Sequence, residues 1–160
     1  MRAVLFAPMF TILVTACGAQ DPGQVIAKVE VSNVVVRLAG VEGRPAAAYF
    51  TLHGGEAPDR LVSISSPRVA TIELHESSTE NGIMTMRALT GVDLPSRGAV
   101  AFQPGGNHAM LFGIDPVVKP GTDLPLRFSF QGGSKVDVKA KTIGMADDMP
   151  MSDDETGHDH

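Results

Sequence analysis

Cysteine is almost missing from this chain of 160 residues, which contains one, Cys17. A single cysteine cannot build an internal disulfide framework, and it rules out a zinc site made of several thiolates. The folded part must therefore be stabilised by its hydrophobic core alone. A body of about 120 residues is large enough for that.

Aromatic residues and excess positive charge are also scarce. Tryptophan is absent, aromatic residues make up 5% of the chain, and the net charge is -5. Nucleic-acid binding needs a basic surface, so no nucleic-acid partner is expected. The acidity is local, because residues 147–160 hold six of the 18 acidic residues and no base. The rest of the chain is close to neutral.

The first 16 residues have the layout of a secretory signal peptide. Arg2 precedes an apolar run that ends in small residues, and the run is too short and too interrupted by Pro8 to span a membrane. The sequence Val14-Thr15-Ala16-Cys17 resembles a bacterial lipobox, in which the cysteine becomes the lipid-modified first residue. The alternative is ordinary cleavage near Ala19. Both interpretations predict export to the periplasm, and the first predicts a lipoprotein that meets the membrane only through its lipid.

No stretch keeps a helical period over ten residues, whereas short alternating apolar segments recur along residues 25–142. Turn signals such as Gly54-Gly55 and Asn81-Gly82 separate them, and Gly132-Gly133 joins the clearest hairpin. This pattern predicts one all-β domain, an antiparallel β-sandwich or barrel. The expected strands are 25–31, 33–37, 46–52, 60–65, 70–76, 82–89, 99–103, 109–113, 124–131 and 134–141.

Residues 144–160 form an acidic tail without apolar periodicity, so we expect it to be disordered without a ligand. One interpretation is a solvated terminus, and the other is a second, looser metal site that captures copper, including Cu(II) through its histidines. The donors of this tail are Met145, Met149, Met151, His158 and His160.

The methionines outside the leader gather in two places, the tail and the region between residues 75 and 110. In that region His75 is followed by Met84 and Met86, and then by His108 and Met110. Residues two apart on a strand share a face, so each pair offers two donors to one side. Considered singly, each methionine is more often core packing. His75 alone would be a solvated surface residue, and His108 alone a turn residue bonded to backbone.

As a set, these side chains suit Cu(I), because thioether sulfur and imidazole nitrogen are soft or borderline ligands. Thioethers also survive an oxidising compartment, where paired thiols would close into a disulfide. We expect the donors at exposed strand ends, with Glu73 and His75 facing outward. A site without a thiolate is not a blue-copper centre. No convergent general base stands out, so an enzyme is not expected.

The spacing of four of these donors, H-x10-M-x21-H-x-M over His75, Met86, His108 and Met110, resembles the signature of the periplasmic copper chaperones called PCu(A)C. Surrounding segments are similar as well, including ATIELHE, NGIMTMR and LPSRGAVAFQPGGNHAMLFGI. The resemblance covers roughly residues 25–142. His53 lies outside the motif, and we interpret it as a surface residue.

The resemblance implies a cupredoxin-like, Greek-key β-sandwich that binds Cu(I) through those four side chains. It further implies delivery of copper to the dinuclear copper centre of cytochrome c oxidase, directly or with Sco-type partners. Met84 is expected beside the site, on the same strand face as Met86, as a neighbour or accessory ligand. Two alternatives stay open: a copper buffer or resistance protein without a delivery partner, and a structural β-sandwich lipoprotein in which His and Met only pack.

Overall fold

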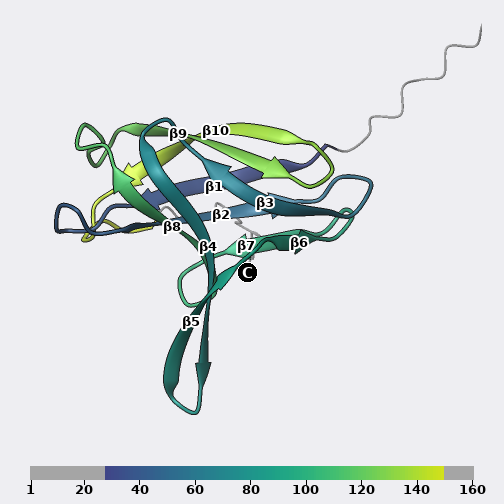
Figure 1. Ribbon diagram of the computed structural model, residues 1–160, viewed down its shortest axis with the longest axis horizontal. Helices are drawn as coiled ribbons and strands as arrows, with labels where there is room; N and C mark the ends of the chain where they lie inside the picture. The colour runs from purple at the N-terminus through teal and green to yellow at the C-terminus, as the bar shows by residue number, and fades with distance from the viewer. Residues whose placement is uncertain (1–27, 150–160) are drawn as a thin grey trace, which may run out of the picture.

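The computed structural model describes residues 28–149, and the secondary structure in that range consists of ten β-strands (Figure 1). No helix among these residues has the length and apolar character needed to cross a membrane. The predicted all-β fold class is therefore confirmed. The strands are β1 (Glu30–Arg37), β2 (Ala46–His53), β3 (Asp59–Ser65), β4 (Val69–Glu80), β5 (Ile83–Leu89), β6 (Val92–Leu94), β7 (Ala99–Phe102), β8 (Asn107–Ile114), β9 (Asp123–Phe130) and β10 (Lys135–Ile143).

The strands form one hydrogen-bonded path in the order β5-β4-β8-β2-β1-β10-β9-β3-β6, with β7 added beside β2. The pairings are antiparallel except for β1 with β10, which is parallel. Phe50 on β2 and Phe128 on β9 are three strands apart on this path, yet their ring centroids lie 4.9 Å apart. A flat sheet would separate them by about 14 Å. The sheet therefore folds over on itself into a sandwich.

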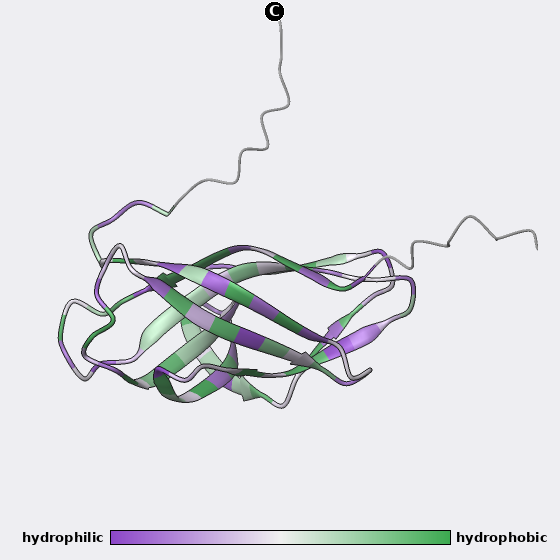
Figure 2. Ribbon diagram, turned by 90° about the horizontal axis from the view of Figure 1, so that it is seen from above, coloured by the Kyte–Doolittle hydropathy of each residue, from purple (hydrophilic) through white to green (hydrophobic). Residues whose placement is uncertain are grey.

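Alternation of apolar and polar residues builds the core between the two layers. On β2 every second side chain is buried, from Ala46 to Leu52, and Figure 2 shows the same banding along the strands. Phe50 also stacks on Phe102 at 4.1 Å, so one aromatic cluster ties β2, β7 and β9 together. The outward positions of the strands are left free for polar or functional side chains.

The first two expected strands are a single strand in the structure. The pairing of β1 with β2 shifts register between Ser32 and Val35, and Asn33 has a positive φ of 53°. This β-bulge turns the alternation out of phase, which is why the sequence pattern looked like two segments. Residues 25–27 lie outside the described range. The short strand β6 was not predicted, because three residues are too few to show alternation.

The hairpin of β4 and β5 projects beyond the sandwich, at the lower edge of Figure 1. Its two-residue turn is Asn81-Gly82, with φ values of 52° and 78°. Positive φ at both positions is the type I′ geometry that matches the twist of paired strands. β4 thus runs to Glu80, four residues beyond the expected end at position 76. Nearly every residue of β5 is exposed, so neither face of this strand is covered by the body.

Candidate metal centre

Strand β4 lies between β5 and β8, and this arrangement places all four predicted donors on one face of the sheet. His75 is directly opposite His108. Met110 is opposite Glu73, two residues before His75, and Met86 is opposite Ser77, two residues after it. Directly paired residues share a face, as do residues two apart, so the donors form one connected row.

That row lies on the outer face of the sandwich. The intervening residues Leu74 and Ala109 are paired with each other and are buried in the core. Leu111 on β8 is also fully buried. The outward direction expected for Glu73 and His75 is therefore confirmed. Met110 points away from the core between two inward neighbours.

The two histidines lie at the centre of the row, with ring centroids 5.9 Å apart and ring planes tilted by 31°. His108 is only 6% exposed, and the side chain of His75 is 15% exposed. The expectation of exposed donors at strand ends is wrong for His108. Its strand lies inside the sheet, and the turn before it docks on β4 through a hydrogen bond from Ser77 N–H to the Gly106 carbonyl.

Each imidazole uses one ring nitrogen to bond with the protein. His108 Nδ1 lies 3.0 Å from the carbonyl oxygen of Gly106, and His75 Nε2 lies 3.0 Å from a carboxylate oxygen of Glu73. His75 Nδ1 is buried and has no hydrogen-bond partner in the described structure. Buried polar atoms are rarely left unpaired. Metal-binding histidines typically give one nitrogen to the metal and the other to a carbonyl or carboxylate, and both rings have this arrangement.

The methionines differ from each other in exposure. Met110 is half-buried beside the histidines, whereas Met86 is 53% and Met84 is 69% exposed. In a flat sheet the Cα atoms of Met86 and Met110 would be about 16 Å apart, from two strand spacings across and four residues along. Two methionine side chains and a shared ion do not span that separation. In such a flat sheet, a complete four-ligand site would require the projecting hairpin to curl toward the histidines.

Met84 and His53, the other two residues considered in the sequence of the body, are not part of the donor row. Met84 is opposite Thr79 near the hairpin turn, on the face of Met86 and one step farther from the histidines. His53 lies at the end of β2, exposed, and shares a hydrogen bond of 2.8 Å with the hydroxyl of Ser32.

The tail is described only at its root. Met145 is 64% exposed and Met149 is half-buried, whereas Met151, His158 and His160 lie outside the described residues. Arg37 donates a hydrogen bond of 2.9 Å to the carbonyl oxygen of Asp147. In the sheet, Arg37 of β1 is opposite Ala47 of β2, and Ala47 is opposite Met110 of β8. The hydrogen bond from Arg37 therefore attaches the start of the tail at a position two strands away from Met110.

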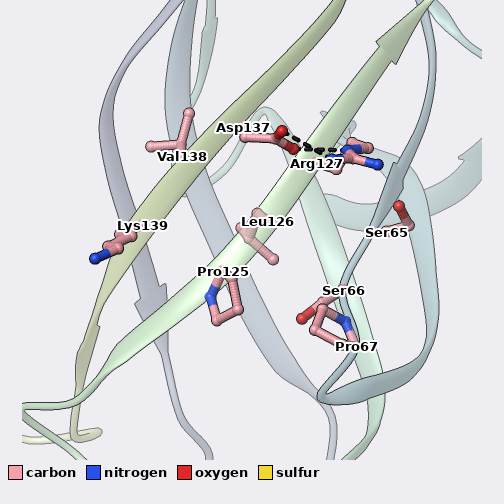
Figure 3. A pocket seen from close by; sticks show the side chains of 9 residues that line it. All are labelled: Ser65, Ser66, Pro67, Pro125, Leu126, Arg127, Asp137, Val138 and Lys139. Carbon is pink, nitrogen blue, oxygen red and sulfur yellow. Dashed lines mark hydrogen bonds and ion pairs between the residues drawn. The ribbon is translucent and has the colours of Figure 1, made fainter.

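A surface cavity of about 640 Å³ lies on a different part of the surface, over β3, β9 and β10 (Figure 3). Arg127 and Asp137 cross it as a two-bond ion pair of 2.6 and 2.9 Å. The hydrogen bonds from Arg127 lower the pKa of the Asp137 carboxyl. None of the predicted metal donors lines this cavity, so cavity size does not locate the donor row.

Harder metal ions have no comparable site in the described part of the chain. Residues 28–149 contain no group of three or more His, Cys, Asp or Glu side chains that could hold a metal ion. The donor row instead combines two histidines with thioethers, which are soft ligands. The sequence predicted a backbone bond for His108 only as an alternative to metal binding, and it did not predict Glu73 as the partner of His75. A glutamate two residues before a histidine on a strand was the available signal, because such residues share a face.

Comparison with known proteins shows first the class of fold. The copper-bound PCuAC domain from PmoF2 is 21% identical and superposes over 74% of this chain and 95% of its own, with a TM-score of 0.61. CuI-DR1885 from Deinococcus radiodurans is 24% identical, covering 79% of this chain and 83% of its own, with a TM-score of 0.57. The chain thus has the cupredoxin-like β-sandwich of PCuAC domains, and the resemblance predicted from the donor spacing is confirmed at the level of fold.

The family follows from the sequence match. Residues 29–142 match the family described as "Putative lipoprotein LpqE-like", and this protein belongs to that family. The "Putative lipoprotein Lxx21020" of Leifsonia xyli subsp. xyli (strain CTCB07) is 33% identical over 117 residues, which are 72% of this chain and 70% of that relative.

Proposed function

We propose that this protein is a copper chaperone that binds Cu(I) through His75, Met86, His108 and Met110. The observation that carries the proposal is the buried, unpartnered Nδ1 of His75, next to His108 on the face that also bears both methionines. A buried lone pair without a donor costs free energy, of order 1–3 kcal/mol, and a metal ion would use it. Copper is the cargo here rather than a resident cofactor.

The donor set supports transfer of copper rather than permanent storage. The histidine pair is nearly closed to solvent, whereas Met86 and Met84 stay exposed on the hairpin. Neutral thioethers bind Cu(I) without charge and can be replaced by the ligands of an acceptor one at a time. An incoming protein would therefore meet the methionines first. Copper would therefore leave the site on the side of the hairpin.

The acceptor that we propose is the dinuclear copper centre of cytochrome c oxidase, reached directly or with a Sco-type partner. We further propose that the chain works in the periplasm, anchored through a lipid on Cys17. Membership in a family of lipoprotein-like chains supports the anchor. Mass spectrometry of the mature N-terminus tests it, and a first residue other than Cys17 would contradict it.

Competition with a chromophoric Cu(I) chelator tests the binding site. We expect one tight equivalent in a chain that ends at Met149, and loss of that equivalent in His75→Ala. His53→Ala is the matched control, because His53 is an exposed histidine outside the donor row. Equal binding in both variants would contradict the site. Mixing the Cu(I)-loaded protein with an apo oxidase copper domain then separates a chaperone from a buffer, which would retain its copper.

We also propose the tail as a second, looser copper site that includes Cu(II) binding through its histidines. The bond from Arg37 to the tail root supports it, because it holds the start of the tail near the donor row. Truncation should follow Met149, because an earlier cut after Lys141 would remove the buried Thr142 and the end of β10. Calorimetry should show a lower copper stoichiometry in the truncated chain. An unchanged stoichiometry would remove the tail site.

A further inference from the structure

Glu73 lies on the donor face, two residues before His75, and its carboxylate touches the imidazole at 3.0 Å. In the described part of the chain, Glu73 forms no ion pair with a lysine or an arginine, and its ion-pair partner is His75. The neighbouring Glu76 instead pairs with Arg87. Glu73 is half-exposed, and it bonds to a candidate metal ligand rather than to a base. Surface solubility alone does not explain this choice of partner.

The chemistry of the contact fixes the position of the proton. An ionised carboxylate only accepts hydrogen bonds, so Nε2 of His75 must donate. The neutral ring then carries its lone pair on Nδ1. That atom is the buried one without a partner. The carboxylate thus holds the ring in the form whose free nitrogen is the buried Nδ1.

His108 is held in the opposite form. The carbonyl oxygen of Gly106 is also an acceptor only, so Nδ1 of His108 donates to it across 3.0 Å. The same carbonyl accepts the backbone N–H of Ser77 at 3.1 Å, which fastens it to β4. The free nitrogen of His108 is therefore Nε2.

We infer that Glu73 is a positioning residue for copper: it fixes His75 as the Nε2–H tautomer, so that Cu(I) binds Nδ1 of His75 and Nε2 of His108. This inference rests on the proposed copper site and deepens it. The two histidines of the motif therefore use different ring nitrogens, a difference that the spacing of the motif does not indicate. A carboxylate partner also raises the basicity of the ligand nitrogen, and partners of this kind are worth about 10- to 100-fold in metal affinity.

The ¹⁵N resonances of the imidazoles test the tautomers in the metal-free protein, measured at about pH 8. We expect His75 to give the Nε2–H pattern with a slowly exchanging Nε2 proton, and His108 to give the Nδ1–H pattern. Added Cu(I), which is diamagnetic, should shift Nδ1 of His75 and Nε2 of His108. Glu73→Ala should speed exchange of the Nε2 proton and lower Cu(I) affinity by about 10- to 100-fold.

Two further variants separate the role of the carboxylate from a general effect on the hairpin. Glu73→Gln keeps an acceptor oxygen without the charge, so its affinity should fall between wild type and Glu73→Ala. Glu76→Ala removes a carboxylate from the same strand that pairs with Arg87, and it should leave the His75 proton unchanged. The amide spectrum of each variant reports whether the fold is kept.

The inference is overturned if wild-type His75 carries its proton on Nδ1, whether or not copper binds. It is also overturned if Glu73→Ala leaves both the Nε2 proton exchange and the copper affinity unchanged. A wild-type chain with the expected tautomers that takes up no Cu(I) would instead contradict the proposed function.

Discussion

The two halves of the donor row differ in how far the protein has prepared them. The histidine half is nearly buried, and each ring is held by a hydrogen bond from one nitrogen. On the hairpin, Met86 and Met84 are more than half exposed. Under the proposed function, the histidines would supply a preformed base for binding, and the methionines would supply a part that can close on copper and open toward an acceptor.

Removing a ligand from the prepared half should have the largest effect. We expect His108→Ala to weaken Cu(I) binding by about 100-fold or more, because even the outer partners of metal ligands are worth about 10- to 100-fold. Folding should suffer by only about 1 kcal/mol, since the Gly106 carbonyl keeps its bond from Ser77. Chelator competition and denaturant unfolding measure the two quantities. Unaltered copper affinity would show that the histidines only pack.

Met86→Leu tests the exposed half of the row. Its affinity for Cu(I) should fall by about 10-fold or more, since one of four soft donors is lost. Its free energy of unfolding should stay within about 0.5 kcal/mol of wild type, because the side chain is more than half exposed. Hydrogen exchange of residues 80–89 should slow on copper loading in the wild type and not in this variant. Equal protection in both would mean that the hairpin does not close on the ion.

Met84→Leu distinguishes the two methionines of the hairpin, because Met84 shares a face with Met86 but lies one step farther out. We expect less than about a 3-fold change in Cu(I) affinity. Transfer to an apo acceptor domain should be slower, since the exposed thioether of Met84 would bind the ion transiently as it leaves the site. Stopped-flow transfer kinetics provide the measurement. An affinity loss as large as that of Met86→Leu would make Met84 a full ligand.

The smallest effect on copper is expected from the opposite surface. Arg127→Ala removes the hydrogen bonds that lower the pKa of Asp137, so that pKa should rise toward its ordinary value. A depressed carboxyl pKa stabilises the fold above the unfolded-state pKa, and the contribution is lost as pH falls through the folded-state pKa. The variant should therefore lack this contribution near neutral pH and become equal to the wild type in this respect in acid, where the wild type has also lost it, while Cu(I) affinity stays unchanged. A shifted copper affinity would show that the two surfaces are coupled.

Much of the fold could be predicted from local patterns. The hairpin joined through Gly132-Gly133 and the turn at Asn81-Gly82 lie where the sequence predicted them, because positive φ favours these residues. The bulge at Asn33 and the three-residue strand β6 were missed. A bulge breaks the two-residue period, and a very short strand has no period to detect. Both exist because neighbouring strands hold them in place.

The chemistry of the candidate site can be read from the amino-acid sequence alone: which donors are present, how they are spaced, and which of them share one strand face. The folded sheet was needed to show that His75 lies opposite His108 and that His108 is buried. It also shows that Glu73 bonds to one ring and the Gly106 carbonyl to the other. The physical reason is register. Spacing along a chain fixes the face of a residue on its own strand. The pairing of β4 with β8, which brings together two histidines 33 residues apart, is set by the folded sheet.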